Sequence, residues 1–595
     1  MKKRGLGLVV LVAALLVAGI LGIAAPAQAA SPDMARWADP LPVPPVAEKT
    51  FKPGISSWAD YYEITMSASQ HQFNQDLGAA TVWTYGQPGK SPVLLGPTIV
   101  AKTGRPVVVK YINQLPTDPN DFPLKDSIDD TLMGWDVPTG AAIPHLHGGH
   151  TAARFDGTPG QYWTADGIKG PDYVSSTFTY MNDQPASLIW YHDHTLGSTR
   201  FKPYLGLAAA YVIFDKVDTG TKINGQNVPA GYGKYHLPLV LQDKEFNDDG
   251  SLFYPTEGIS DAHPIWVPEF FGDTPVVNGM AYPYLDAQPR RYRLRLLNGS
   301  QASFYNVGFD RENGADIPFW VIGSDGGLLP KPAETTSLRI GPGERYDVII
   351  DFTGIPLGSS IMMTNDAKAP FPDGDDTTVP ELMKININTA VPADDPDKSV
   401  LPAKLKLPGI ARLTGTPGVK ARDVVLKETM VPGFEGEEVP SEVLLNGYAF
   451  TDPTSDFIKL GTTETWRWIN LTVDAHPMHQ HLVEFQVVNR QAFDAESYKT
   501  DWTAYLDGGR AGPKPRLSAY LTGPRMAPDP AEMGFKDTVM APPGYVTRTR
   551  AKFTLPVTSL LDYNFKTRSF GNWVYHCHIL EHEENDMMRP FEVVR

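Results

Sequence analysis

Short runs in which apolar and polar residues alternate recur at three places along this chain, and each run ends in asparagine. They span residues 104–113, 291–298 and 463–470. Alternation with a period of two is the pattern of a strand with one buried face. The second and third runs also follow an Asn-Gly pair, at residues 278–279 and 446–447, which favours a tight hairpin turn. The pattern predicts an all-β fold built from three related sandwich domains.

The spacing of the three runs sets the expected domain boundaries. We place the domains at residues 45–218, 230–392 and 420–595, with linker regions at 215–225 and 391–420. The chain of 595 residues agrees with this number, since domains average about 150 residues. Its 54 prolines and 53 glycines favour short strands and many turns over long helices. Residues 491–534 are interpreted as an irregular insertion with a short helix near 496–506.

The first 30 residues have the composition of an export signal peptide. Three basic residues follow Met1, an apolar run covers residues 6–25, and Ala-Gln-Ala at 27–29 supplies small residues for cleavage. We expect export by a Sec-type route to a secreted, cell-surface or periplasmic location. An uncleaved signal anchor is the alternative, because the apolar run is longer than a typical signal core. No later run is long and apolar enough to span a bilayer.

The only cysteine of the chain, Cys577, lies among candidate metal ligands. His576, His578 and His582 lie within five residues of it, and Met587 follows ten residues later. Valine and aromatic residues before Cys577 suggest a strand, in which Cys577 points to one face and both adjacent histidines to the other. A thiolate, two imidazoles and a weak axial thioether are the ligands of a blue-copper electron-transfer site. Cys577, His582 and Met587 supply three of these four.

Eleven of the 14 histidines lie in four short clusters, and each cluster contains a His-x-His pair. The pairs are His145 with His147, His192 with His194, His479 with His481, and His576 with His578. On a strand, both rings of such a pair project from one face and can reach one metal cluster. A single pair is weak support for a metal, because histidines are often structural. Four pairs, one of them around the sole cysteine, favour copper over a structural zinc site, which would need more cysteines.

The remaining histidines are sorted by strand parity and by position. His476 has the parity opposite to the His-x-His pair that follows it, so it is the best candidate for the missing blue-copper histidine. The four pairs come equally from the first and third predicted domains, so we expect a metal cluster at the interface of these domains. The middle domain would be a spacer, and its His236 and His263 are interpreted as structural. His150 lies outside any pair and is left unassigned.

In their order along the chain, these motifs resemble those of the multicopper oxidases. The motifs are His-x-His-Gly from residue 145, His-x-His from 192, His-Pro-x-His-x-His from 476 and His-Cys-His-x3-His-x4-Met from 576. Residues 145–149, 250–255, 323–330 and 576–590 are most similar to three-domain bacterial spore-coat laccases. Bilirubin oxidases and phenoxazinone synthases are close relatives of that group. The resemblance implies three cupredoxin-like Greek-key β-sandwich domains and four coppers per chain.

The resemblance also implies a role for each candidate ligand. The type 1 copper would be held by His476, Cys577, His582 and Met587. The type 2 copper would be held by His145 and His479. The type 3 pair would be held by His147, His192, His194, His481, His576 and His578. Two acidic residues match those that supply protons in the similar laccases, namely Glu583 and Asp156, and an ordinary salt-bridge or capping role is the alternative for each.

These features predict an oxidase that takes single electrons from a small reducing substrate and reduces O2 to two waters. Phenols or aromatic amines are the first expectation, while bilirubin, o-aminophenols and the ions Mn(II), Cu(I) and Fe(II) stay open. Carboxylates beside the type 1 site would favour Mn(II) or Fe(II), but sequence does not place them. A copper carrier or a structural coat protein is the alternative from another class. The net charge of −16 argues against a nucleic-acid partner, and the oligomeric state is open.

Overall fold

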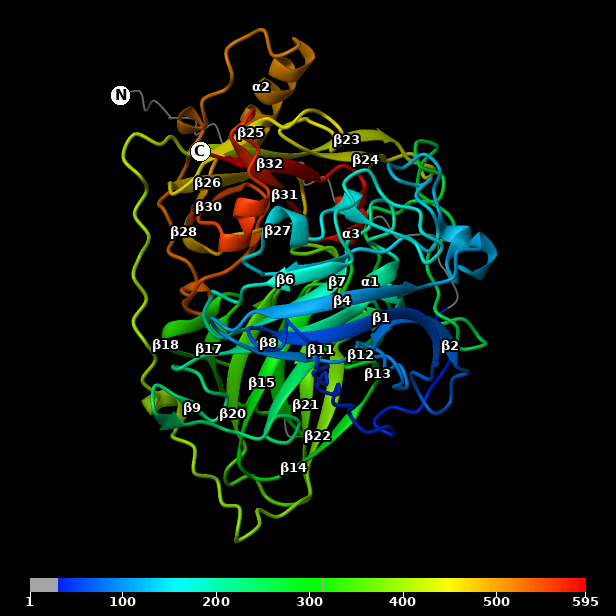
Figure 1. Ribbon diagram of the computed structural model, residues 1–595, viewed down its shortest axis with the longest axis vertical. Coiled ribbons are helices and arrows are strands. Elements are labelled where there is room, and N and C mark those ends of the chain that lie inside the picture. Colours follow the sequence, from blue (N-terminus) through cyan, green and yellow to red (C-terminus); the bar gives the residue numbers. More distant parts are fainter. Residues whose placement is uncertain (1–29, 313) are drawn as a thin grey trace, which may run out of the picture.

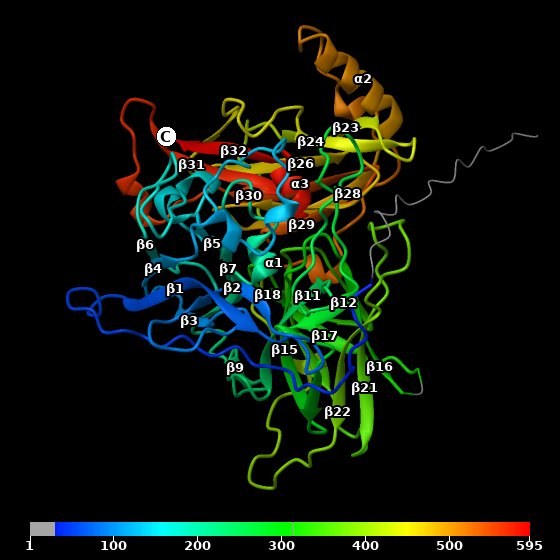
Figure 2. The same ribbon diagram turned by 90° about the vertical axis from the view of Figure 1, so that its right-hand side faces the viewer.

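The structure is a computed structural model of the 595-residue chain, and it describes residues 30–312 and 314–595. Almost all of the predicted signal peptide, residues 1–30, lies outside the described residues. In the described part, six sheets form three pairs, and a hydrophobic core runs through each pair. Figures 1 and 2 show the last third of the chain at one end, the middle third at the other, and the first third against both. The predicted all-β fold is confirmed.

The first third of the chain contributes two four-stranded sheets. One has the order β2 (Ala80–Gly86), β1 (Asp60–His71), β4 (Val107–Gln114) and β6 (Thr177–Tyr180). The other has the order β3 (Ile99–Lys102), β8 (Ala208–Phe214), β7 (Ser187–Asp193) and β5 (Pro144–His147). The short helix α1 (Lys202–Leu205) precedes β8. After β8, the strands β9 (Lys222–Ile223) and β10 (Gln226–Asn227) form a two-stranded antiparallel ribbon.

The middle third forms the largest sheet. Its seven strands have the order β13 (Met280–Ala281), β12 (Thr274–Val277), β11 (His236–Lys244), β15 (Arg291–Asn298), β20 (Arg345–Asp351), β17 (Phe319–Ser324) and β18 (Gly327–Thr335). The sheet packed against it has the order β14 (Tyr284–Ala287), β22 (Glu381–Ile387), β21 (Ser359–Asn365), β16 (Tyr305–Arg311) and β19 (Ser337–Ile340).

The last third contributes two five-stranded sheets. One has the order β24 (Glu438–Leu445), β23 (Arg422–Pro432), β26 (Thr463–Asn470), β30 (Tyr545–Lys552) and β28 (Phe485–Ala492). The other has the order β25 (Asp456–Lys459), β32 (Met588–Val594), β31 (Ser569–Cys577), β27 (His476–Gln480) and β29 (Thr538–Ala541). The helix α3 (Leu580–Glu584) connects β31, which ends at Cys577, to β32.

The three alternating runs of the sequence occupy equivalent places in the three sheet pairs. The strands β4, β15 and β26 each pair in parallel with the strand that opens its own third of the chain, β1, β11 or β23. The asparagine that ends each run is buried. Its side-chain amide forms hydrogen bonds both to the backbone that follows the strand and to the backbone of nearby loops. Asn470, for example, donates to the carbonyls of Asp474 and Ala541 and accepts from the N–H of Thr472. The same double role recurs at Asn113 and Asn298.

The insertion in the last third contains the helix that the sequence predicts. The helix α2 (Ala495–Asp507) begins after Asp494, whose side chain accepts a hydrogen bond from the N–H of Ser497. Tyr498 and Trp502 form its buried face and join a small cluster that also contains Leu517. Figures 1 and 2 show α2 projecting beyond the sheets of the last third. No helix among the described residues is both long and apolar enough to cross a membrane.

Segments far apart in the sequence meet where the first and last thirds of the chain contact each other. The indole N–H of Trp573 donates to the carbonyl of Thr151 at 3.2 Å, although 422 positions separate them. The guanidinium of Arg200 pairs with the carboxylate of Glu584 in α3 at 2.9 Å, and both side chains are buried. A buried pair of this kind fixes the two segments relative to each other, since breaking it leaves an uncompensated charge. The histidine motifs lie at this interface.

Candidate metal centres

The structure brings together three donor atoms around Cys577. Its Sγ lies 3.6 Å from Nδ1 of His476 on β27 and 3.9 Å from Nδ1 of His582 in α3. Met587 is fully buried, and its backbone closes the loop: its carbonyl accepts from the N–H of Cys577 and its N–H donates to the carbonyl of His582. A thiol and two imidazoles are therefore held together in the core, and the buried Met587 belongs to the same core cluster as Cys577.

Burial sets the protonation state of this first group. Burial lowers the pKa of His582 to about 3 and that of His476 well below its usual range. Both rings are therefore neutral near pH 7 and can act as ligands. Burial also raises the pKa of the Cys577 thiol well above its usual range, so a thiolate at this position requires a bound cation.

Eight further histidines form a second, larger group on the other face of β31. They fall into three sets, and within each set the possible ligand atoms lie within 4.8 Å of one another. The sets are His145 with His479 and His481, His147 with His192 and His578, and His194 with His481 and His576. All eight rings are buried. Each set combines histidines of the first third of the chain with histidines of the last third.

Two pairs of antiparallel strands position these eight rings. In the first third, β5 pairs with β7 so that His145 lies opposite His192. In the last third, β27 pairs with β31 so that His479 lies opposite His576. The two strand pairs face each other, and their rings stack. The ring centroids of His145 and His481 are 3.8 Å apart, and those of His147 and His479 are 3.7 Å apart.

The hydrogen bonds of the histidine rings fit a metal cluster. Six rings use one nitrogen in a hydrogen bond that fixes the orientation of the ring: His145, His147, His192, His479, His481 and His576. Several buried ring nitrogens have no hydrogen-bond partner, namely Nε2 of His145, His192 and His479, Nδ1 of His147, and both nitrogens of His194 and His578. Buried nitrogens without partners are costly unless a ligand binds them, and metal-bound histidines characteristically hold their second nitrogen in such a hydrogen bond.

The two acidic residues singled out in the sequence both contact this group. The carboxylate of Glu583 lies 3.3 Å from Nδ1 of His194 and 2.9 Å from Nδ1 of His576. Asp156 accepts from Nδ1 of His481 at 2.6 Å and from the hydroxyl of Thr151 at 2.6 Å. Burial raises the pKa of Asp156 to about 8, against the effect of the Thr151 hydrogen bond. Both carboxylates therefore lie in direct contact with rings of the histidine cluster.

The other histidines of interest lie outside both groups. His150 is half-buried, and its Nδ1 lies 2.8 Å from a carboxylate oxygen of Asp183. His236 accepts from the guanidinium of Arg295 at 2.8 Å within the middle third of the chain. His263 contacts the hydroxyl of Thr131 and the carbonyl of Ser441.

One acidic residue that the sequence did not single out supports two of the histidines. Oδ1 of Asp537 lies 3.1 Å from Nε2 of His147, and the backbone carbonyl of Asp537 accepts from Nδ1 of His479 at 2.9 Å. The guanidinium of Arg345 donates to both oxygens of Asp537, at 2.6 and 2.5 Å. Burial opposes ionisation of Asp537, but Arg345 holds the pKa of this carboxyl well below its usual range. Asp537 therefore stays a charged acceptor for His147.

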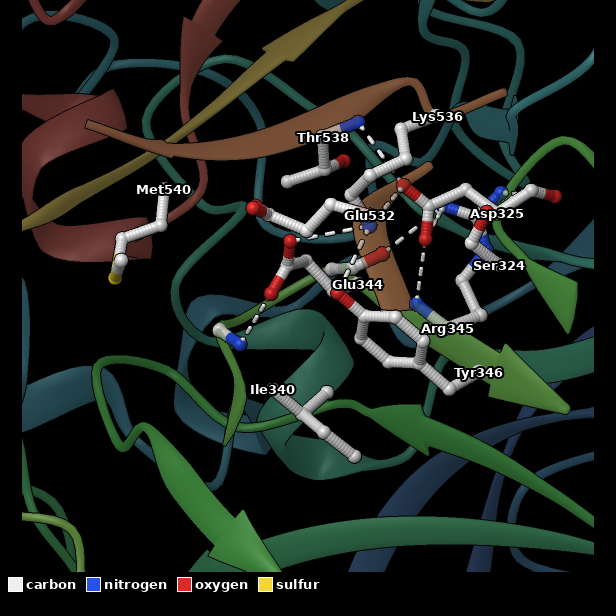
Figure 3. A network of polar contacts seen from close by, with 12 residues as sticks. Ser324, Asp325, Ile340, Glu344, Arg345, Tyr346, Glu532, Lys536, Thr538 and Met540 are labelled. Carbon is white, nitrogen blue, oxygen red and sulfur yellow. Dashed lines mark hydrogen bonds and ion pairs between the residues drawn. The ribbon is translucent and has the colours of Figure 1, made fainter. Parts of the chain in front are cut away.

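Arg345, which donates to Asp537, also belongs to a buried network that joins the middle and last thirds of the chain (Figure 3). Asp325 accepts from the backbone N–H of Arg345 at 2.7 Å, and its other oxygen lies 3.0 Å from the ammonium group of Lys536. Lys536 also pairs with Glu344 at 3.2 Å. The middle third thus contributes to the histidine cluster through charged side chains.

Two glycines permit the close approach of backbone to this site. Gly148, which ends the His-x-His-Gly motif, has a φ of +85°, and a Cβ there would lie 2.6 Å from both Arg345 and Asp537. Gly343 has a φ of +79°, and a Cβ there would lie 2.7 Å from the ring of His578. Both positions combine a left-handed backbone with no room for a side chain, so only glycine fits.

Comparison with known proteins gives the class to which this fold and these sites belong. Family models described as "Multicopper oxidase" match residues 190–379 and 425–595. The chain is 36% identical to a laccase of Bacillus subtilis (strain 168), over 94% of this chain and 98% of that protein. It is 34% identical to "Multicopper oxidase LPR1" of Arabidopsis thaliana, over 89% and 88% of the two chains. A solved laccase of Pediococcus acidilactici shares the fold, with a TM-score of 0.66 at 24% identity and coverage of 96% and 95%.

The fold and the donor groups thus define a copper-dependent oxidoreductase that uses O2. The chain belongs to the multicopper oxidase family. Its three pairs of sheets are the cupredoxin-like architecture of that family, as the sequence predicts.

Proposed function

We propose that this chain is a laccase-like oxidase that couples four one-electron oxidations of a small reducing substrate to the reduction of one O2 to two waters. Phenols and aromatic amines are the proposed substrates, and the similarity to proteins named laccase supports them. One observation carries the proposal. Cys577 belongs to one donor group, and its neighbours His576 and His578 belong to the other. Two peptide bonds therefore connect an electron entry site with a separate cluster of eight histidines.

We assign the donor groups to four coppers per chain. The type 1 copper would be held by His476, Cys577, His582 and Met587. The type 2 copper would be held by His145 and His479. The type 3 pair would be held by His147, His192, His194, His481, His576 and His578. The partnerless nitrogens of these rings and their grouping within 4.8 Å support the assignment. The bound coppers would supply the one-electron chemistry.

The residues of the chain would bind, orient and supply protons. The strand pairs β5–β7 and β27–β31 keep the histidine rings in place and exclude water from the cluster. Reduction of one O2 to two waters consumes four protons. Glu583, which contacts His194 and His576, and Asp156, which contacts His481, would supply them from buried positions.

We also propose domain boundaries at 45–218, 230–392 and 420–595, and export through the N-terminal signal. Each proposed domain contains one pair of sheets, and most of the core between the two sheets comes from that domain, which supports the boundaries. The basic start and apolar run of the first 30 residues support export.

The copper content tests the proposed function. Fully reconstituted protein is expected to contain four coppers per chain and to show an intense visible band from thiolate-to-copper charge transfer. It is also expected to consume one O2 for every four equivalents of a phenol such as 2,6-dimethoxyphenol. Metal analysis, absorption spectroscopy and an oxygen electrode measure the three quantities. A stable content of one copper with no oxygen uptake would favour a carrier instead.

Asp537 provides a separate prediction about the histidine cluster. Asp537→Asn is expected to weaken copper binding at the cluster by about 10–100-fold, the usual cost of losing a residue that orients a histidine ligand. The amide keeps the size of the side chain but loses the charge that Arg345 and His147 face. Copper retained after dialysis against a chelator measures the effect, with the blue band as an internal reference. The exposed Asp507→Asn is the control, and equal copper retention in both variants would contradict the prediction.

A second candidate function is the oxidation of metal ions. One solved structure with the same fold, from Campylobacter jejuni, is titled a metallo-oxidase, with a TM-score of 0.63 at 18% identity and coverage of 95% and 99%. That likeness supports the fold alone. The observation that favours the candidate is that acidic residues lie near the Cys577 group. Asp474 lies two residues before His476, Glu581 directly precedes His582, and the charge of Glu269 acts on the Cys577 thiol.

A further inference from the structure

The motif at residues 323–330 lies in the middle third of the chain, and none of its residues belongs to a candidate ligand set of the described chain. It forms a hairpin in which β17 ends at Ser324 and β18 begins at Gly327, so Asp325 and Gly326 make the turn. This turn packs against residues 535–538, which lead into β29 (Figure 3). The motif therefore joins the middle third to a segment of the last third.

Two hydrogen bonds hold the turn close to residue 535. The hydroxyl of Ser324 donates to the carbonyl of Phe535 at 3.0 Å, and the N–H of Gly326 donates to the same carbonyl at 2.8 Å. A Cβ at Gly326 would lie 2.7 Å from the Cβ of Phe535, which is closer than real side chains approach, so this position needs glycine. Two donors on one carbonyl fix the chain directly before Lys536.

Asp325 is the centre of the contacts that follow. Its side chain is fully buried, and its Oδ1 accepts from the backbone N–H of Arg345 at 2.7 Å. Its Oδ2 accepts from the N–H groups of Asp537 and Thr538, at 3.2 and 3.3 Å, and lies 3.0 Å from the ammonium nitrogen of Lys536. All of these partners are donors. A carboxylate, which offers only acceptor atoms, fits them, whereas an amide would place its NH2 group against a donor in either orientation.

Asp537 and Thr538, in turn, contact two rings of the histidine cluster. The carboxylate of Asp537 lies 3.1 Å from Nε2 of His147, and its backbone carbonyl accepts from Nδ1 of His479 at 2.9 Å. The hydroxyl of Thr538 lies 3.1 Å from the same nitrogen of His147 and 3.2 Å from Nδ1 of His479. Asp325 is therefore connected to both rings through one intervening residue.

We propose that Asp325 is a positioning residue for the type 2 copper, because it fixes the segment that orients His479. The inference rests on the proposed function, which assigns His145 and His479 to that copper. The segment thus orients one of the two proposed type 2 ligands. Of the six proposed type 3 ligands, His147 alone contacts this segment in the part of the chain that the structure describes. The middle third would therefore act on the type 2 site without supplying a ligand to it.

The other proposed coppers have separate supports. Glu583 contacts His194 and His576, which are two of the type 3 ligands. Nε2 of His476, a proposed type 1 ligand, lies 2.7 Å from the hydroxyl of Thr472. Loss of the carboxylate in the turn is therefore expected to weaken the type 2 copper first and to leave the type 1 copper in place.

The test compares copper-loaded Asp325→Asn with the wild type. The variant keeps the size of the side chain but turns one oxygen into a donor that faces other donors. It is expected to lower the affinity for the type 2 copper by about 10–100-fold, the usual cost of losing a residue that orients a ligand. Samples dialysed against a graded series of chelator concentrations measure this, because one EPR spectrum records the type 1 and type 2 coppers together. Glu334→Gln, an exposed position on β18 of the same hairpin, is the matched control.

Ser324→Ala is the second variant, because it leaves every charge of the network in place. It removes one hydrogen bond to Phe535 and is expected to lower the affinity for the type 2 copper by a smaller factor than Asp325→Asn. If Asp325→Asn does not fold, Ser324→Ala decides alone. A type 2 affinity below that of Glu334→Gln then supports the proposal, and an equal affinity overturns it.

The outcomes separate this proposal from the proposed function. Loss of the type 2 signal with an unchanged type 1 signal supports positioning by Asp325. Parallel loss of both signals would indicate a general loss of stability and would overturn the proposal. If the wild type holds four coppers and the variants retain them equally well, the proposal is overturned and the proposed function stands. A wild type without a type 2 signal overturns the copper assignment, and this proposal with it.

Discussion

Cys577→Ser is expected to abolish the blue band and to reduce phenol oxidation by more than about 100-fold. The loss should exceed the roughly 10–100-fold cost of removing a residue that merely supports a ligand. Serine keeps the size of the side chain, so the buried pocket stays filled. It lacks the polarisable, easily deprotonated sulfur that copper selects and that lies 3.6 Å from His476. Absorption spectroscopy and oxygen uptake measure the two effects, and far-UV circular dichroism measures the fold.

A conservative variant of the axial position is the control for this result. Met587 is fully buried, and Met587→Leu keeps its apolar volume. This variant is expected to retain the blue band, because a long axial thioether binds weakly and mainly adjusts the copper potential. If Cys577→Ser still oxidised phenols at a rate near that of the wild type, electrons would enter the protein at another site.

The sequence predicts strands well where the pattern is purely local. The runs at 291–298 and 463–470 coincide with β15 and β26. The run at 104–113 does not, because β4 begins at Val107. Gly104 has a φ of +75° and forms a turn, and Pro106 has no N–H to donate to a neighbouring strand. Turn chemistry therefore shortened a strand that hydrophobic alternation alone would extend.

The candidate metal motifs can be recognised in the sequence because each keeps its candidate ligands within a few residues. His576, Cys577 and His578 alternate on one strand, so their separation onto two faces follows from strand geometry. The supporting residues have no such signal. Asp537 lies 390 positions from His147 and 192 from Arg345, and each is a single charged residue in an unremarkable segment. Only the folded chain brings them together.

Acidic residues near the Cys577 group illustrate the same limit. Glu581 and Asp474 lie beside predicted ligands, but nothing in their local sequence distinguishes them from surface acids. Glu269 and Glu428 come from a loop and a strand with no motif at all. Glu428 stands out only because it is buried and one of its oxygens has no hydrogen-bond partner, and both are properties of packing. Sequence therefore predicts the candidate ligands, whereas the buried acidic residues near them emerge only from the folded structure.

His578→Ala is expected to separate the two functions of the segment around Cys577. His578 belongs to the donor set with His147 and His192, and both of its ring nitrogens lack hydrogen-bond partners. The variant should therefore retain the blue band and its rapid bleaching by a phenol under argon. Recovery of the band on mixing with O2 should slow by about 100-fold or more, because a missing ligand costs more than the 10–100-fold of a supporting residue. Stopped-flow spectroscopy follows both steps in one experiment.

His150→Ala is the matched control for this variant. His150 also lies near the interface of the first and last thirds of the chain. It is half-buried, pairs with Asp183 and belongs to none of the donor sets. Its replacement should leave both bleaching and recovery unchanged. The alternation of β31 makes the expected outcome specific, because only Cys577 faces His476 and His582. If His578→Ala lost the blue band but kept an intact binuclear pair, the assignment of His578 to the far face of the strand would be wrong.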